Sequence, residues 1–183
     1  MIIKPNAIHP VLYNKIRQEI TAKNFSWAFG ETTDGDRDVY GYSFSNLIFS
    51  DDDREQVSFE PLSYFCLMAI AMFCYDIGFP LAKVIRIRAG LITATKHTHY
   101  HSPHVDYPEP HYTALLYFTN CNGKTQFYNE KYIEGVDPQL TIREEIIPEE
   151  NKLVLFDGHT YHNSSTQTDT ASRIAINFNL LQK

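Results

Sequence analysis

The chain has 183 residues, a length typical of one domain, and its composition of 43% hydrophobic and 21% charged residues is ordinary for a globular protein. Its net charge of -6 disfavours nucleic acid as a partner, because a phosphate backbone attracts basic surfaces. No apolar run approaches the roughly 20 residues of a membrane helix, and the first residues do not resemble a secretory signal. We therefore expect one acidic domain that does not enter a membrane, and the sequence leaves its oligomeric state open.

The chain has 3 cysteines and no CxxC motif, which favours a reducing compartment over a disulfide scaffold. Cys66 and Cys74 lie in one predicted helix. At about 1.5 Å of rise per residue they would be roughly 12 Å apart, too far for a disulfide. We expect both to be core residues and the protein to be cytoplasmic, in the host cytoplasm if its source is a virus.

The first part of the chain has a mainly helical pattern. Residues 9–23 place apolar side chains near 3.6-residue spacing, which predicts a helix with one apolar face. Residues 58–77 predict a second, more apolar helix that ends at Gly78. Between the two, residues 25–29 are a candidate short strand and residues 34–38 a polar loop.

The second part has the pattern of β-strands. Residues 83–92 alternate apolar and basic positions, and residues 112–119 are rich in residues that favour strands. Asn122-Gly123 is a turn signal, so residues 125–128 are expected to pair after it in a hairpin. Further strands are expected at residues 140–147, 152–157 and 172–180.

These two patterns together predict an α+β fold within one domain. Helices in residues 1–80 would support a largely antiparallel β-core formed by residues 81–183. Short strands separated by turns at roughly 8–12-residue intervals suggest a sandwich or a barrel.

The histidines are concentrated in the β half. Only His9 precedes residue 81, and the others of the 8 histidines lie near the ends of predicted strands, where loops often carry chemistry. In an extended segment His104 and Asp106 point to the same side, so an imidazole and a carboxylate can meet at one ion. The alternative is a simple His–Asp hydrogen bond on a loop.

A second histidine and an arginine in an apolar segment extend this pattern downstream. Two histidines and one carboxylate with open positions are the ligand set of non-haem Fe(II) oxygenases, and His162 or His159 follows the predicted strand at 152–157. Arg173 lies in the apolar final strand, where a guanidinium needs an anionic partner such as a bound dicarboxylate. The alternative for Arg173 is a strand-edge residue whose charged end reaches solvent.

In this order, the His104-Val105-Asp106 triplet, His162 and Arg173 resemble the Fe(II)- and 2-oxoglutarate-dependent dioxygenases. The stretches HVDYPEPHYTALLYFTNCNGKTQFYN and LVLFDGHTYHNSSTQTDTASRIAINFNL are most similar to the prolyl-4-hydroxylase-like branch, and the resemblance covers about residues 85–180. Three positions depart from that branch, which usually has Lys at the position of Arg173, Gly at the position of Asn122 and an acidic residue at the position of Lys124.

The resemblance implies a double-stranded β-helix, or jelly-roll, core with a metal site at one end. Fe(II) would be bound by His104, Asp106 and His162, since the family spacing to Arg173 favours His162 over His159. O2 would take an open metal position.

The resemblance also implies a 2-oxoglutarate site beside the metal. Arg173 would pair with the distal carboxylate of 2-oxoglutarate, and Thr125 and Tyr117 would contact this co-substrate. Fe(II), 2-oxoglutarate and O2 are thus the implied cofactors and co-substrates.

The activity implied is hydroxylation of an organic substrate, with decarboxylation of 2-oxoglutarate to succinate and CO2. We expect a protein or peptide side chain such as proline. The alternatives are the same chemistry on a small molecule or a nucleobase, and a non-catalytic jelly-roll module that binds a metal.

Several residues near the site have more than one interpretation. The loops at residues 34–42 and 97–110 are expected to set selectivity, and His97, His99 and His101 are expected to lie on a solvated loop that covers the site.

The roles of two further pairs of residues remain open. Arg86 and Arg88 are expected on a charged, solvent-exposed strand face, and Tyr107 and Tyr117 are expected to line the substrate pocket.

Overall fold

The computed structural model describes residues 1–30, 42–51 and 60–183. The predicted polar loop at residues 34–38 lies outside this part of the chain, as do most of the candidate selectivity loop at 34–42 and the first residues of the predicted second helix.

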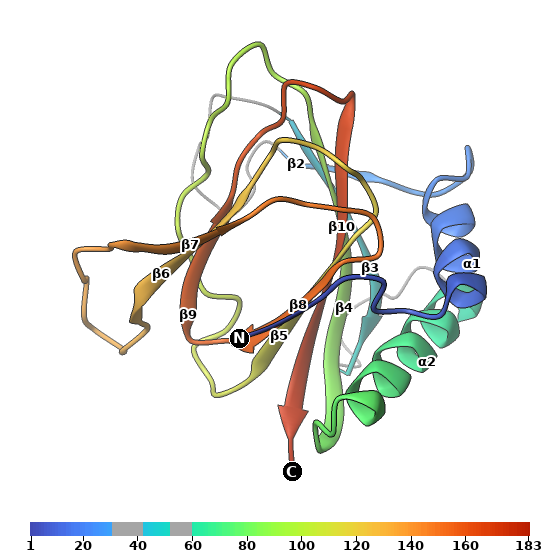
Figure 1. Cartoon of the computed structure of the whole chain (residues 1–183), viewed down its shortest axis with the longest axis horizontal. Helices are drawn as coiled ribbons and strands as arrows, with labels where there is room; N and C mark the ends of the chain where they lie inside the picture. The colour runs from blue at the N-terminus through green and yellow to red at the C-terminus, as the bar shows by residue number, and fades with distance from the viewer. Residues whose placement is uncertain (31–41, 52–59) are drawn as a thin grey trace.

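The described residues form two antiparallel sheets and two helices (Figure 1). The helices are α1 (Pro10–Ile20) and α2 (Glu60–Asp76). The strands are β1 (Ile2–Lys4), β2 (Ala28–Gly30), β3 (Ser43–Ser50), β4 (Leu81–Thr93), β5 (Tyr112–Tyr117), β6 (Thr125–Lys131), β7 (Ile142–Ile146), β8 (Leu153–Asp157), β9 (Thr160–Ser164) and β10 (Ser172–Gln182).

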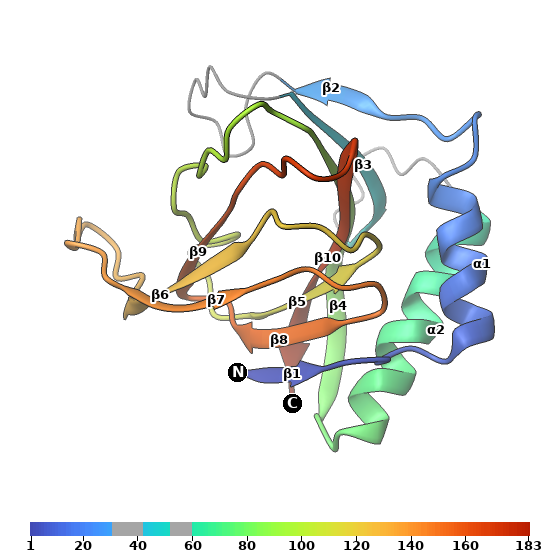
Figure 2. The ribbon, with the colours of Figure 1, turned by 45° about the horizontal axis from the view of Figure 1, so that its top comes forward.

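One sheet is large and the other is small. The large sheet has the order β1-β8-β5-β10-β4-β3-β2, and the small sheet has the order β7-β6-β9. Both helices lie on one side of the large sheet, and the small sheet lies on its other side (Figures 1 and 2). This arrangement confirms the predicted α+β jelly-roll fold.

Both helices form where the sequence predicts them. The His9 ring accepts a hydrogen bond from the Val11 N–H at the start of α1, and Pro10 occupies the first turn, where its missing N–H costs nothing. After α2, Gly78 adopts a φ of 69°, a backbone conformation that favours glycine. In the described part of the chain, neither helix is long and apolar enough to cross a membrane.

The core between the helices and the large sheet is the main apolar cluster. It includes Ile16 and Ile20 of α1, Phe73 of α2 and Phe178 of β10. Cys66 and Cys74 are buried and unbridged in this core, as predicted.

A second, smaller cluster lies between the two sheets. Along β5, Ala114 and Leu116 point to the helices, whereas Leu115 and Tyr117 point to the small sheet. Since successive residues of a strand face opposite sides, the same strands build a stability core on one face and can present other side chains between the sheets.

Two sequence predictions are wrong in detail. Residues 1–80 were expected to supply helices, but they also hold β1, β2 and β3, which join the large sheet. The strand predicted at residues 25–29 begins later, at Ala28.

The hairpin predicted around Asn122-Gly123 is also wrong. β6 does not pair with β5 but lies between β7 and β9 in the other sheet. The Asn122 N–H donates to both carboxylate oxygens of Asp169, at 3.1 and 3.0 Å, so this segment is attached to the loop before β10. It therefore carries the chain from one sheet to the other.

Candidate metal centre

His104, Asp106 and His162 come together at one point between the sheets. Their ligand atoms all lie within 4.8 Å of one another. His104, in the segment before β5, forms an antiparallel bridge with His162 of β9, in which each N–H donates to the other's carbonyl at 3.0 Å. The backbone bridge thus places the two imidazoles side by side, with ring centroids 4.8 Å apart.

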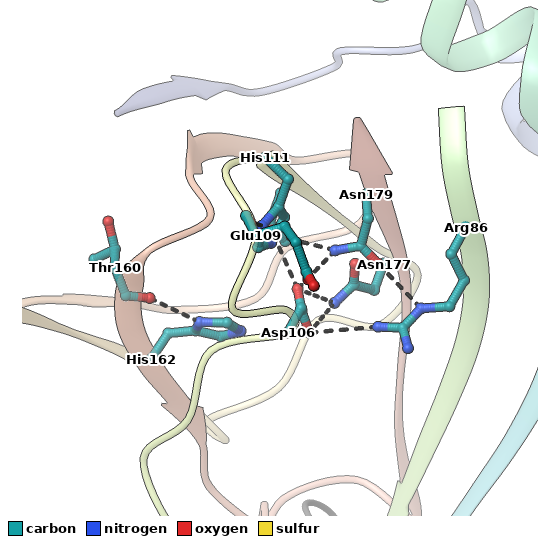
Figure 3. A network of polar contacts seen from close by, with 9 residues as sticks. Arg86, Asp106, Glu109, His111, Thr160, His162, Asn177 and Asn179 are labelled. Atoms are coloured by element: carbon teal, nitrogen blue, oxygen red, sulfur yellow. Dashed lines mark hydrogen bonds and ion pairs between the residues drawn. The ribbon is translucent and has the colours of Figure 1, made fainter. Parts of the chain in front are cut away.

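The Asp106 carboxylate is held by side chains from two neighbouring strands (Figure 3). Oδ2 accepts from Thr113 Oγ1 at 2.9 Å, from Asn179 Nδ2 at 2.8 Å and from Asn177 Nδ2 at 3.1 Å. Arg86 Nη2 lies 3.7 Å from Oδ1. Thr113 and Asn179 are direct partners in the β5–β10 register, so strand pairing positions the donors that orient this carboxylate.

The ionisation states of Asp106 and His162 both suit the binding of a divalent cation. Burial raises the pKa of Asp106, but the nearby His162 and His104 and the Asn177 hydrogen bond outweigh it and hold the pKa well below its usual range. Burial and the neighbouring His104 lower the pKa of His162 to about 4, so this imidazole is neutral near pH 7. An ionised carboxylate and neutral imidazoles are what a metal ion requires of its ligands.

The backbone also selects the tautomer of each histidine. Nδ1 of His162 lies 3.1 Å from the Thr160 carbonyl oxygen, and Nδ1 of His104 lies 3.2 Å from the Ser102 carbonyl oxygen. A carbonyl accepts and cannot donate, so each Nδ1 carries the proton and each Nε2 keeps a lone pair for an ion.

Arg173 of β10 lines the same cavity as the candidate metal ligands. Its residue exposure is 6%, and its Nη2 donates to Thr125 Oγ1 at 2.7 Å while its Nε donates to the Gly123 carbonyl at 3.2 Å. Among the described residues no carboxylate pairs with this guanidinium, and burial lowers its pKa. Because a buried charge is costly without a partner, this site fits an anionic ligand.

Gly123 makes this arrangement sterically possible. A Cβ at this position would lie 2.9 Å from the Ser165 carbonyl oxygen and 3.2 Å from Cδ of Arg173. Any larger residue would therefore push against the arginine side chain, which accounts for glycine at this point of the segment between the sheets.

A cavity of about 160 Å³ joins these groups. His104, Asp106, His162, Thr125 and Arg173 all line it. Tyr117 has no exposed surface and lies behind them, with its hydroxyl 2.8 Å from Thr125 Oγ1 and its ring 5.6 Å from the Arg173 guanidinium carbon. It thus supports Thr125 and Arg173 from within the core.

The other histidines, all in the described part of the chain, do not belong to this group of ligands. His159 Nε2 is 2.9 Å from the Pro108 carbonyl oxygen, and His159 is not among the grouped ligands of the described residues. The expected solvated loop is wrong at His101, which is buried and whose carbonyl accepts from Asn163 Nδ2 at 2.7 Å. His97 is exposed as expected.

Sequence reasoning missed two groups of functional side chains. One is the set that holds Asp106, namely Thr113, Asn177 and Asn179, for which alternating asparagines in an apolar final strand were the available signal. The other is the pair Arg86 and Arg88: Arg88 is exposed as expected and Arg86 is partly buried, but both line the cavity.

Tyr107 was expected to line the pocket. Its ring instead lies against the guanidinium of Arg86, with the guanidinium carbon 4.6 Å from the ring centroid. Tyr107 therefore helps to fix a cavity-lining arginine.

A scan against protein-family models finds no match for this chain, and a search of the curated proteins finds none either. Solved structures share its fold over nearly the whole length. A prolyl hydroxylase from Trichoplax adhaerens, in complex with a hypoxia inducible factor peptide fragment, has a TM-score of 0.66 at 13% identity and matches over 99% of this chain and 83% of its own.

Two other solved structures show the same likeness. A prolyl-4-hydroxylase from Pseudomonas putida has a TM-score of 0.62 at 13% identity, over 100% of this chain and 92% of its own. The α-ketoglutarate-dependent carbocyclase SnoK from nogalamycin biosynthesis has a TM-score of 0.68 at 14% identity, over 99% of this chain and 79% of its own. The chain therefore has the fold of these oxygenases, in agreement with the resemblance in sequence.

Proposed function

We propose that this protein is an Fe(II)- and 2-oxoglutarate-dependent dioxygenase that hydroxylates an organic substrate and converts 2-oxoglutarate to succinate and CO2. One observation carries the proposal. A cluster of two histidines and a carboxylate shares one cavity with a buried arginine that has no acidic partner in the described part of the chain. That combination suits a metal ion and a dicarboxylate bound next to each other.

Two sets of residues in the cavity have separate proposed roles. His104, Asp106 and His162 would bind Fe(II), which supplies the activation of O2 when bound. Thr113, Asn177 and Asn179 hold the Asp106 carboxylate in place, so the metal site is preorganised.

The co-substrate would be bound at the other end of the cavity. Arg173 and the Thr125 hydroxyl would bind the distal carboxylate of 2-oxoglutarate, and the surrounding apolar residues Leu115, Leu91 and Ile92 would exclude water from it. A fixed guanidinium in a dry site binds a carboxylate more strongly than one in solvent.

A protein or peptide side chain such as proline is the substrate class we propose first. The support is the likeness to prolyl hydroxylases, one of them solved with a peptide fragment. A small molecule is the second candidate, supported by the likeness to the carbocyclase SnoK and the epimerase SnoN of nogalamycin biosynthesis. A nucleobase is disfavoured by the net charge of -6.

The decisive test measures succinate formed from 2-oxoglutarate in the presence of Fe(II), O2 and a peptide panel. We expect turnover by the wild-type protein and its loss in Asp106→Ala, because the metal loses its anionic ligand. Arg143→Gln is the matched surface control, since Arg143 is exposed on β7, and it should retain turnover.

Two results would contradict the proposal. Full turnover by Asp106→Ala would remove the metal assignment. Stoichiometric zinc that Fe(II) cannot displace from anaerobically purified protein would instead favour the non-catalytic metal-binding module. The buried, unbridged cysteines agree with a reducing compartment, which we propose as its location and in which iron stays ferrous.

A further inference from the structure

One face of β4 places a row of side chains along the cavity. Arg86, Arg88, Gly90 and Ile92 alternate along this strand and all line the cavity. In the β4–β10 register Ile92 is opposite Arg173, whereas Arg88 is opposite Asn177. Four residues of a strand span roughly 13 Å, so the backbone positions of Arg88 and Arg173 belong to opposite ends of the cavity.

The cavity carries more positive charge than the proposed co-substrate needs. Its described lining holds three arginines and one carboxylate, Asp106, in a chain whose net charge is -6. A divalent metal adds two positive charges and 2-oxoglutarate removes two. The net positive charge of the cavity is therefore the same after metal and co-substrate have bound. Because Arg173 pairs with the co-substrate, the remaining positive charge lies around Arg86 and Arg88.

These two arginines are held differently. Arg86 is fixed, because its Nε donates to Asn179 Oδ1 at 3.1 Å and its guanidinium lies over the Tyr107 ring. Its contact with Asp106 is long, at 3.7 Å. Arg88 is exposed, and its guanidinium makes no hydrogen bond or ion pair with any residue that the structure describes.

The position of Arg88 suits a ligand that enters after the co-substrate. Arg88 is the cross-strand partner of Asn177, whose side chain donates a hydrogen bond to the proposed metal ligand Asp106. Arg88 is exposed, whereas Arg173 is buried. An anion bound here would lie next to the metal centre but away from the 2-oxoglutarate carboxylate at Arg173. Guanidinium groups bind carboxylates through paired hydrogen bonds, which orient the ligand as well as attract it.

We propose that Arg88, with Arg86 behind it, binds a carboxylate of the substrate, so that this enzyme selects acidic substrates. The inference rests on the proposed function, since it places the substrate at the metal site assigned above. The carboxylate can belong to a free organic acid or to an acidic side chain of a peptide, and both present the same group to Arg88.

The test measures binding to the protein loaded with Fe(II) and saturating 2-oxoglutarate under anaerobic conditions, so that no turnover occurs. The probes are a panel of short carboxylic acids, each with its primary amide, and capped prolyl peptides that contain either Glu or Gln. Calorimetry gives the dissociation constant of each member of a pair. We expect at least one acid or Glu peptide to bind about tenfold more tightly than its neutral partner.

Variants test whether Arg88 is the source of the preference for the acid over its neutral partner. Arg88→Gln should abolish it while leaving the affinity for 2-oxoglutarate unchanged, and Arg88→Lys should restore part of it. Arg143→Gln removes the same charge from an exposed strand outside the cavity and should keep the preference. Because Arg88 is exposed and makes no hydrogen bond or ion pair with a described residue, its replacement should leave the fold intact.

The outcomes separate the two proposals. A preference confined to the peptide pair assigns the carboxylate to an acidic peptide, and one confined to the free acids assigns it to a small molecule. Equal binding of all acids and amides, or a preference that survives in Arg88→Gln, would overturn the inference alone. Loss of 2-oxoglutarate binding in Arg88→Gln would also overturn it, by assigning Arg88 to the co-substrate. Failure of wild-type protein to bind 2-oxoglutarate would overturn the proposed function, and this inference with it.

Discussion

The two faces of β10 have opposite chemistry although they belong to one strand. Ile174, Ile176, Phe178 and Leu180 point to the helices and are buried in the main core. Arg173, Ala175, Asn177 and Asn179 alternate with them and point between the sheets, toward the cavity and the Asp106 carboxylate. Stability and the candidate chemistry thus depend on alternate residues of one strand, which substitutions can separate.

The largest expected effect is on the helix-facing side. Phe178 is fully buried, so Phe178→Ala should lower the free energy of unfolding by about 3–5 kcal/mol, through lost apolar contact and the cavity left behind. Urea denaturation measures this change. The 2-oxoglutarate affinity of the folded fraction should be unchanged, and a large loss of that affinity would show that the two faces are coupled.

The second largest effect is expected from removing the buried charge of Arg173 on the opposite face of β10. Arg173→Gln should weaken 2-oxoglutarate binding by roughly 100-fold, about 2.7 kcal/mol, because the co-substrate loses its charged partner. Calorimetry with metal-loaded protein measures this, and Arg173→Lys should recover part of the affinity. An unchanged dissociation constant would mean that the carboxylate binds elsewhere.

A smaller effect is expected from the residues that orient a metal ligand. Asn179→Ala removes a 2.8 Å hydrogen bond to Asp106, and should weaken Fe(II) or Mn(II) binding by about tenfold. Metal titration measures the affinity. Asn129→Ala, at an exposed position of β6, removes an asparagine far from the cavity lining and should bind metal as the wild type does.

The smallest effect is expected from a substitution on the helix-facing side of β10. Ile176→Val removes one buried methylene group and should cost about 0.5–1.5 kcal/mol of unfolding free energy, with no change in metal or 2-oxoglutarate affinity. Together with Asn179→Ala, it compares two buried side chains on opposite faces of the same strand. A change in metal affinity in Ile176→Val would contradict the separation of the faces.

Strong local patterns made much of the fold predictable. Both helices and the strands β4, β5, β8 and β10 follow their hydrophobic periodicity. β9 was missed, because the segment TYHNS carries polar side chains at buried positions, one of which is the candidate metal ligand His162. A functional strand of this kind lacks the apolar alternation by which strands are recognised.

The candidate metal ligands were predictable for a different reason. His104 and Asp106 are two residues apart, and the order of His162 and Arg173 after them resembles a known motif set. The side chains that hold Asp106 carry no such signal. Thr113 and Asn179 meet only because β5 and β10 pair in a particular register, which links residues far apart in the chain.

The sequence by itself determined the periodicities, the ordered ligand set and the fact that Arg86 and Arg88 share one face of a strand. Only the tertiary structure decided which face that is. Alternation along a strand is local, but whether a face meets solvent or a second sheet depends on where distant segments pack. Here β6 pairs with β7 and β9 in the small sheet instead of with β5, and residues of this small sheet line the same cavity as Arg86 and Arg88. Arg88 stays exposed and Arg86 is partly buried, but both arginines line the candidate active site.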